Sequence, residues 1–314
     1  MTTITQLPPY LDWPPFRRWL KACQADGREQ DAFERIKAWT EMVDSHDVVR
    51  TWVDGRVGWI EIAYPIKGNA YVPPLYGLLH AAILKHGEDE EVRCIAVTGA
   101  GKNFSSGGYV GDHAFFAGLD SGEDGTRTEP MRRTFVELFQ APNRALYECE
   151  KPTVAVINGL VAGEAIDLML SADVRVASTA ADIWFSAAYS GNTGYSGSAY
   201  LLPKIVGAGV AKRLMLTASR ITAEQAFEYG VVTEVFPAEI HRSKAQELCE
   251  KIGSLPPITL RLIKQELNKS YEIPAYSSAM DVYAAIETIV QTTDDHMNAE
   301  VAIAKKETPP VHGR

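Results

Sequence analysis

The order of apolar and polar positions divides the chain into a helical opening, a region of alternating strands and helices, and a helical end. After prolines at positions 8, 9, 14 and 15, apolar residues recur at near-helical spacing from Phe16 to Val43. This spacing predicts one or two amphipathic helices that pack on another part of the molecule. Two apolar runs, 48–52 and 57–63, then flank an Asp54-Gly55 pair. Such a pair is a strong turn signal, so a β-hairpin is expected to open the core.

Strands and helices are predicted to alternate in the middle of the chain. Apolar runs predict strands at 94–98, 153–157, 173–177, 183–185 and 231–236. Helical spacing predicts helices at 75–85, 131–149, 164–171, 208–218 and 223–229. Alternation of this kind is typical of an α/β fold built from β-α-β crossovers.

Beyond Pro237 the pattern is helical only, with helices predicted at 245–252, 259–268 and 279–304. The chain is therefore divided into an N-terminal helical extension (1–48), an α/β core (49–240) and a C-terminal helical region (241–314). The last region carries a wide apolar stripe, which a monomer would expose. The stripe comprises Leu248, Ile252, Leu260, Ile263, Leu267, Met280, Val282, Ile286 and Ile289. We expect these helices to lie at a subunit interface.

Composition narrows the class of protein. The 314 residues carry a net charge of −9, and 46% are hydrophobic, which excludes a disordered chain. No dense block of lysine and arginine is present, so nucleic acid is not an expected partner. No secretory leader and no apolar run long enough for a membrane span is found, so no membrane partner is expected. Four cysteines at positions 23, 94, 149 and 249 match no metal-ligand or redox spacing, which indicates reduced thiols, no metal site and a cytoplasmic location.

Two glycine-containing turns are the first candidates for chemistry. Residues 98–109 and 158–167 each follow a predicted strand and lead toward a helix. Turns of this kind can aim backbone N–H groups at one point, where a helix N-terminus adds a partial positive charge. Two such donors would form an oxyanion hole. A single glycine-rich turn more often serves only chain reversal and close packing.

The order of several motifs is more specific than either turn alone. The segment 151–163, Lys-Pro-Thr-Val-Ala-Val-Ile-Asn-Gly followed by a second glycine four residues later, precedes Ser171-Ala-Asp173 and Gly207 without a gap. Asn69-Ala70, Phe104-Ser-Ser-Gly-Gly108 and Lys264 with Asn268 add to the series. Over about residues 50–270 the chain resembles the enoyl-CoA hydratase/isomerase (crotonase) superfamily. Residues 1–48 fall outside this resemblance.

The resemblance implies a crotonase-like spiral of β-β-α turns, a C-terminal helical region used in trimerisation, and a pocket for an acyl-coenzyme A thioester. Backbone N–H groups at positions matching Gly108 and Glu164 would grip the thioester oxygen and stabilise an enolate. Coenzyme A would enter only as part of the substrate, with no separate cofactor. Its contacts are expected at Lys67, Asn69, Ala70, Ser106 and Lys264. The expected assembly is a homotrimer or homohexamer.

The expected acid and base groups depart from the pattern of the hydratases. Of their two carboxylates, the first falls on Asp167 and the second on Ala187, which cannot move a proton. No Asp or Glu occurs from position 183 to 207, so a shift of register does not recover the second carboxylate. Glu164 lies three residues before Asp167, and if both face a dry cavity their repulsion should raise the pKa of one. Tyr195 and His113 are further candidate catalytic residues.

These features predict an acyl-CoA enzyme that works through a thioester enolate. Hydration, double-bond isomerisation and hydrolytic carbon–carbon cleavage of a β-keto ring or chain all pass through such a species. Loss of the carboxylate at Ala187 favours the last two reactions. A non-catalytic crotonase-fold protein that serves binding or assembly is the alternative from another class.

Overall fold

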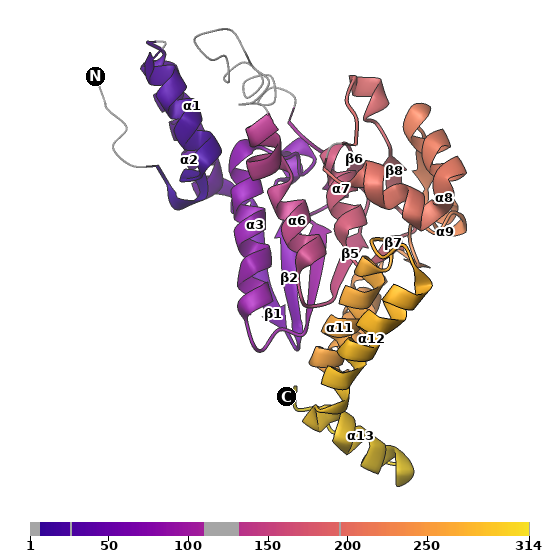
Figure 1. Cartoon of the computed structure of the whole chain (residues 1–314). Coiled ribbons are helices and arrows are strands. Elements are labelled where there is room, and N and C mark those ends of the chain that lie inside the picture. Colours follow the sequence, from indigo (N-terminus) through magenta and orange to yellow (C-terminus); the bar gives the residue numbers. More distant parts are fainter. Residues whose placement is uncertain (1–6, 26, 110–131, 195, 314) are drawn as a thin grey trace.

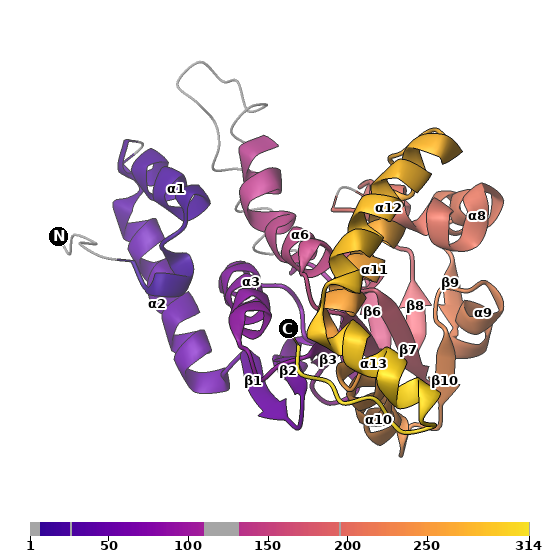
Figure 2. The same ribbon diagram turned by 60° about the horizontal axis from the view of Figure 1, so that its bottom comes forward.

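The computed structural model describes residues 7–25, 27–109, 132–194 and 196–313. A short 3₁₀ turn, η1 (Pro9–Leu11), leads into two helices, α1 (Pro14–Ala25) and α2 (Glu29–His46). This confirms the predicted helical opening. The two helices, which we call the N-terminal helix pair, stand to one side of the core in Figures 1 and 2. They pack on each other through Phe16, Trp19 and Trp39, whose ring centroids lie 5.5–5.9 Å apart in two pairs.

The main sheet has six strands in the order β1-β2-β3-β5-β7-β10. Its strands are β1 (Val49–Asp54), β2 (Val57–Ile62), β3 (Cys94–Gly99), β5 (Thr153–Ile157), β7 (Val174–Ser178) and β10 (Glu234–Phe236). The predicted hairpin is confirmed, because β1 and β2 pair antiparallel across the Asp54-Gly55 turn. The remaining pairs are parallel. Parallel strands are usually covered on both faces, which explains why β2, β3 and β5 are buried along their whole length.

A second sheet of four short strands has the order β4-β6-β8-β9. Its strands are β4 (Asn103–Ser105), β6 (Leu160–Ala162), β8 (Asp182–Trp184) and β9 (Arg220–Thr222). Successive turns of the chain place one strand in each sheet, as β3 and β4, then β5 and β6, then β7 and β8 do. Helices follow these strand pairs, namely α6 (Ala141–Glu148), α7 (Glu164–Ser171) and α8 (Ser198–Leu216). The predicted spiral of β-β-α turns is therefore confirmed.

Alternate residues of the main sheet supply two cores. Ile60, Ile95 and Ala155 belong to the larger core, which also contains α3 (Pro73–Glu88), α7 and the N-terminal helix pair. Trp59 and Val154 point to the other face, where α10 (His241–Gly253) covers them. The period of two along each strand thus assigns each side chain to one of two hydrophobic layers.

Four predictions of secondary structure were wrong in detail. The predicted helix 131–149 is interrupted in its described part by a π-helical turn, η3 (Phe135–Phe139), and α6 starts with Pro142 near its N-terminus, where no N–H is needed. The predicted helix 208–218 is only the second half of α8, which kinks at Gly207. The predicted helix 279–304 is two helices, α12 (Tyr276–Gln291) and α13 (Asp294–Ala304), because Thr293 caps the N–H of His296 at 3.2 Å. The last strand begins at Glu234 rather than at residue 231, since the N–H of Val231 still closes the turn after α9 (Ala223–Glu228).

The C-terminal helical region leaves the core after α10, and α13 extends away from it in Figure 1. After α10, α11 (Pro257–Lys269) buries Leu262 and Lys264, whereas α12 has no fully buried residue. Large apolar side chains on these helices stay exposed, among them Leu267 (63%) and Ile289 (50%). The helices found in the described part of the chain are all too short or too polar to cross a membrane. The four cysteines are free thiols, three of them buried.

Candidate active site

The two predicted turns lie against each other beside the second sheet. Tyr71 holds the first turn, because its N–H donates to the Gly107 carbonyl at 2.8 Å and its own carbonyl accepts from the N–H of Tyr109 at 3.0 Å. Gly107 has a φ of 83°. A Cβ atom on Gly107 would lie 2.5 Å from the Ala162 carbonyl oxygen and 3.0 Å from the Cα of Gly163, so no side chain fits there.

The second turn leads directly into α7. Gly163 is the N-cap residue with φ 54°, and its N–H donates to the Ser186 hydroxyl at 3.1 Å. A Cβ atom placed on Gly163 would lie 4.0 Å from the backbone nitrogen of Gly108. Gly108 and the start of α7 at Glu164 are therefore neighbours, although they are separated by more than fifty residues of sequence. The backbone amides at the start of a helix have no partner inside the helix, and they make this corner electropositive.

The Glu164 side chain is buried, with 6% of its residue surface exposed. Its Oε2 atom accepts a hydrogen bond from the Tyr76 hydroxyl of α3. The Tyr76 ring in turn contacts the rings of Tyr71 and Phe139, with centroids 5.5 and 5.2 Å away. The carboxylate is thus held by a phenol within an aromatic wall.

Asp167 lies one turn further along α7 and is 4% exposed. Its Oδ1 atom accepts the N–H of Ser198, the first residue of α8, at 2.6 Å. Burial raises the pKa of Asp167 to about 6, partly opposed by the Ser198 hydrogen bond and increased by the negative charge of Glu164. The expected upward shift of one carboxyl pKa is confirmed for Asp167, with burial rather than the neighbouring charge as its main cause.

Tyr71 is a candidate that the sequence did not single out. Its hydroxyl is buried, and it has no hydrogen-bond partner among the described residues. Burial, together with the charges of Glu164 and Asp167, raises the pKa of Tyr71 well above its usual value, so the phenol keeps its proton. In the sequence, only its place directly after the Asn69-Ala70 pair could have indicated that Tyr71 belongs to the site.

The residues expected to contact coenzyme A gather around the first turn, with one exception. The Asn69 side chain is part of the scaffold, because Nδ2 donates to the carbonyls of Ala100 and Asn103 at 2.9 and 2.7 Å. Ala70 is buried next to it. Lys67 is exposed, and the Ser106 hydroxyl donates to its carbonyl at 3.4 Å. These residues thus join the first turn to a neighbouring turn at 65–68, from which the Lys67 side chain projects.

Lys264 lies elsewhere, on α11. Its ammonium pairs with Asp173 at 2.8 Å and donates to the Lys151 carbonyl at 3.1 Å, with only 9% of the side chain exposed. Asp173 also accepts from the N–H and the hydroxyl of Thr153, at 2.8 and 2.9 Å. In a single chain this lysine ties α11 to the main sheet, and its contact with coenzyme A stays a prediction.

Ala187 follows β8 and precedes a 3₁₀ turn, η4 (Ala188–Ser190). Ser186, the residue before it, accepts the N–H of Gly163 and so joins this segment to the start of α7. His113 and Tyr195 lie outside the described residues. Within the described ranges, no three His, Cys, Asp or Glu side chains form a group that would hold a metal ion.

Comparison with known proteins finds relatives that match most of the chain. A sequence model described as "Enoyl-CoA hydratase/isomerase" matches residues 53–310. The 1,2-epoxyphenylacetyl-CoA isomerase of Escherichia coli K12 is 26% identical over 269 residues, which is 85% of this chain and 99% of that protein. The short-chain-enoyl-CoA hydratase of Clostridium acetobutylicum is 30% identical over 219 residues, which is 70% of this chain and 80% of that protein. A crystal structure of enoyl-CoA hydratase from Bacillus anthracis superposes with a TM-score of 0.76 at 25% identity and covers 85% of this chain and all of that one.

Proposed function

Since the chain belongs to the enoyl-CoA hydratase/isomerase family, we propose that it binds an acyl-CoA thioester and isomerises it by moving a proton through an enolate. The observation that carries this proposal is Asp167, a buried carboxyl with a pKa of about 6 that is held by the start of α8. A group that titrates near the working pH can both take up and release a proton at useful rates.

The proposed enolate is stabilised by the two turns. The N–H groups of Gly108 and Glu164 are the proposed donors to the thioester oxygen, which gains negative charge when the proton leaves. Contact between Gly107 and Gly163 supports this assignment, because it brings both donors to one corner of the molecule. Loss of one such donor typically costs about 2.7–4 kcal/mol of barrier.

Proton movement is assigned to Asp167 alone. Its carboxylate takes a proton from the substrate carbon, which leaves an electron pair delocalised onto the thioester oxygen. The same carboxyl returns the proton to another carbon of the conjugated system, so the product has the same atoms as the substrate. Glu164 contributes its backbone N–H, while its side chain is engaged by Tyr76.

Tyr71 is proposed to donate a hydrogen bond to the bound substrate. A buried hydroxyl without a partner costs about 1–3 kcal/mol, which a polar group of the substrate would offset. Because its pKa is raised well above the usual value, the phenol acts as a donor and not as a base.

Isomerisation is favoured over hydration because the addition of water needs a second group to orient and deprotonate the water. In this chain, the position that matches this second carboxylate of the hydratases is occupied by Ala187. The relative from Escherichia coli, which this chain matches over 99% of its length, is named an isomerase. This likeness supports the same reaction class and leaves the acyl group open.

Self-association is part of the proposal. The apolar side chains of α11 and α12 are exposed in a single chain, and α12 buries none of its residues. A second copy of the chain is the proposed occupant, in a trimer or a dimer of trimers, because a soluble monomer rarely leaves so many large apolar side chains in water.

The test is a panel of enoyl-, dienoyl- and β-keto-CoA thioesters incubated with the pure protein in D₂O. Deuterium exchange at carbon or double-bond migration is expected with at least one enoyl substrate. Hydration of crotonyl-CoA with a kcat of about 10 s⁻¹ or more would contradict the assignment to isomerisation. Cleavage of a β-keto thioester would replace it with the carbon–carbon hydrolase, and inertness with retained binding of coenzyme A would favour the binding protein.

A further inference from the structure

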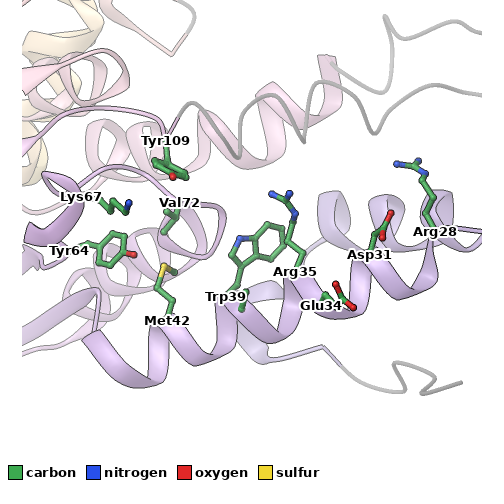
Figure 3. Close-up of a pocket in the computed structure, with 11 residues that line it drawn as sticks. Arg28, Asp31, Glu34, Arg35, Trp39, Met42, Tyr64, Lys67, Val72 and Tyr109 are labelled. Carbon is green, nitrogen blue, oxygen red and sulfur yellow. The ribbon is translucent and has the colours of Figure 1, made fainter.

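A pocket of about 660 Å³ lies between the N-terminal helix pair and the core. Helix α2 supplies one wall, through Arg28, Asp31, Glu34, Arg35, Ala38, Trp39 and Met42. The core supplies the other wall, through Tyr64, Lys67, Val72 and Tyr109. Figure 3 shows these two walls facing each other. The volume is within the range of about 300–1,000 Å³ that is typical of ligand sites.

The chemistry of the lining differs between the two ends of the pocket. At the core end, Lys67 lies over the Tyr109 ring, with Nζ 5.7 Å from the centroid, and Tyr64 lies beside it. Arg35 and Trp39 rise from α2 in Figure 3, on the side that faces the core wall. Two cations among three aromatic rings suit a ligand that has both anionic groups and a flat base.

The outer end has the opposite character, because Asp31 and Glu34 are exposed there beside the half-buried Arg28. An anion entering the pocket is repelled by these carboxylates and attracted by Lys67 and Arg35. The charges therefore direct a phosphorylated ligand toward the core.

The core end of the pocket adjoins the first turn of the candidate active site at Tyr109. Tyr109 follows Gly108 directly, and its N–H is bonded to the Tyr71 carbonyl at 3.0 Å. A ligand whose phosphates lie between Lys67 and Arg35 can thus reach the first turn with its other end.

The helix pair is fixed firmly enough to form a wall. Trp13 contacts His80 of α3 with ring centroids 5.0 Å apart, and Arg18 pairs with Glu137 of η3 at 2.7 Å. A Cβ atom on Gly77 of α3 would lie 2.6 Å from the Tyr10 carbonyl oxygen, so the extension packs closely on the core. Because this wall is already in place, a ligand can bind without the entropic cost of ordering the helix pair.

We propose that the N-terminal helix pair is a substrate-binding element, in which Arg35 of α2 and Lys67 of the core together hold the phosphates of the nucleotide end of the thioester. This inference rests on the proposed function for the identity of the ligand. The new assignment is to residues 28–42, which lie outside the matched family region of 53–310. The extension makes the enzyme selective for full-length coenzyme A thioesters over truncated ones.

The experiment measures the affinity of the protein for coenzyme A and for pantetheine, which lacks the nucleotide, by calorimetry. Arg35→Gln is expected to weaken coenzyme A binding about tenfold or more and to leave pantetheine binding unchanged. Lys37→Gln is the matched control, because Lys37 is exposed on the same helix and pairs only weakly, at 3.7 Å, with Glu41. Arg35→Lys keeps the charge and should retain most of the affinity. Circular dichroism confirms that each variant is folded.

The outcomes separate this inference from the proposed function. Equal coenzyme A affinity of Arg35→Gln and Lys37→Gln would overturn the inference, whether or not deuterium exchange is seen. In that event, the proposed enolate chemistry would still stand if Arg35→Gln catalyses deuterium exchange of a pantetheine thioester as fast as the wild type does. Selective loss of coenzyme A binding in a protein that catalyses no exchange would support the inference and refute the function.

Discussion

Asp167→Asn is expected to lower activity strongly while making the folded protein relatively more stable at neutral pH. Asparagine keeps the size of the side chain and an oxygen that can accept the Ser198 N–H. It removes the group that titrates, so turnover of the true substrate should fall about 10²–10⁴-fold.

The effect on stability follows from the pKa of Asp167, which rises from an ordinary value of 3.8 to about 6 in the fold. A shift of about two pKa units corresponds to about 3 kcal/mol. Between these two values the folded state holds a proton that the unfolded state has released. The contribution of Asp167 to stability is therefore most favourable below pH 3.8, declines as the pH rises and is constant above about pH 6. In Asp167→Asn, residue 167 does not titrate, so its contribution to stability does not fall as the pH rises.

The measurement is urea unfolding of both proteins at pH 4 and pH 7.5. Relative to wild type, Asp167→Asn should gain up to about 3 kcal/mol between the two pH values. Asp12→Asn is the control, because Arg17 donates to Asp12 at 2.7 Å and lowers its pKa. That variant should become relatively less stable as the pH rises and should keep full activity.

Two results would refute the reasoning. Near-normal turnover of Asp167→Asn would remove Asp167 from the mechanism. A stability difference that does not change with pH would show that the carboxyl is not held in an environment unfavourable to its charge. In wild type, kcat/KM should rise through about pH 6, as the base form of Asp167 accumulates.

Three further outcomes are expected. Tyr71→Phe should lower kcat/KM without lowering the free energy of unfolding, since it removes a hydroxyl that has no partner in the described part of the chain. Gly107→Ala should lose activity and stability in thermal and kinetic assays, because its Cβ would lie 2.5 Å from a carbonyl oxygen, whereas Gly27→Ala, also at positive φ but with no atom within 4 Å, should keep activity. Light scattering should give a multiple of the 34.5 kDa chain mass, and a monomer at micromolar concentration would contradict the proposed assembly.

Elements with a strong local pattern could be predicted from the sequence. The turn at Asp54-Gly55 and helix α7 were placed to within a residue, because turn chemistry and an apolar run of the right length agree there. The second sheet was largely missed, since β4, β6 and β9 are three residues each and too short to show a period. Thr293 was also missed as a helix boundary, because the apolar spacing continues across it.

The candidate site was predictable where it depends on the backbone. Gly107 and Gly163 mark turns where two backbone segments come close together, and the structure shows that the two turns lie against each other. Side-chain partners were not predictable, because Tyr76 and Glu164 are 88 positions apart and meet only through tertiary packing. The pocket between α2 and the core could not be predicted either, because the N-terminal helix pair lies outside the region that resembles the family.

The pairing of Glu164 with Tyr76 separates the roles of the two buried acidic residues of α7. Glu164 and Asp167 lie three residues apart on α7, and both side chains are buried. Here Glu164 is bound by a phenol and Asp167 by a backbone N–H, so each has a different partner. The phenol holds the Glu164 side chain in place, and the first backbone N–H of α8 holds Asp167. If Asp167 is the one group that moves protons, as proposed, it can return a proton to another carbon, which suffices for isomerisation, whereas hydration would also need a group that activates water.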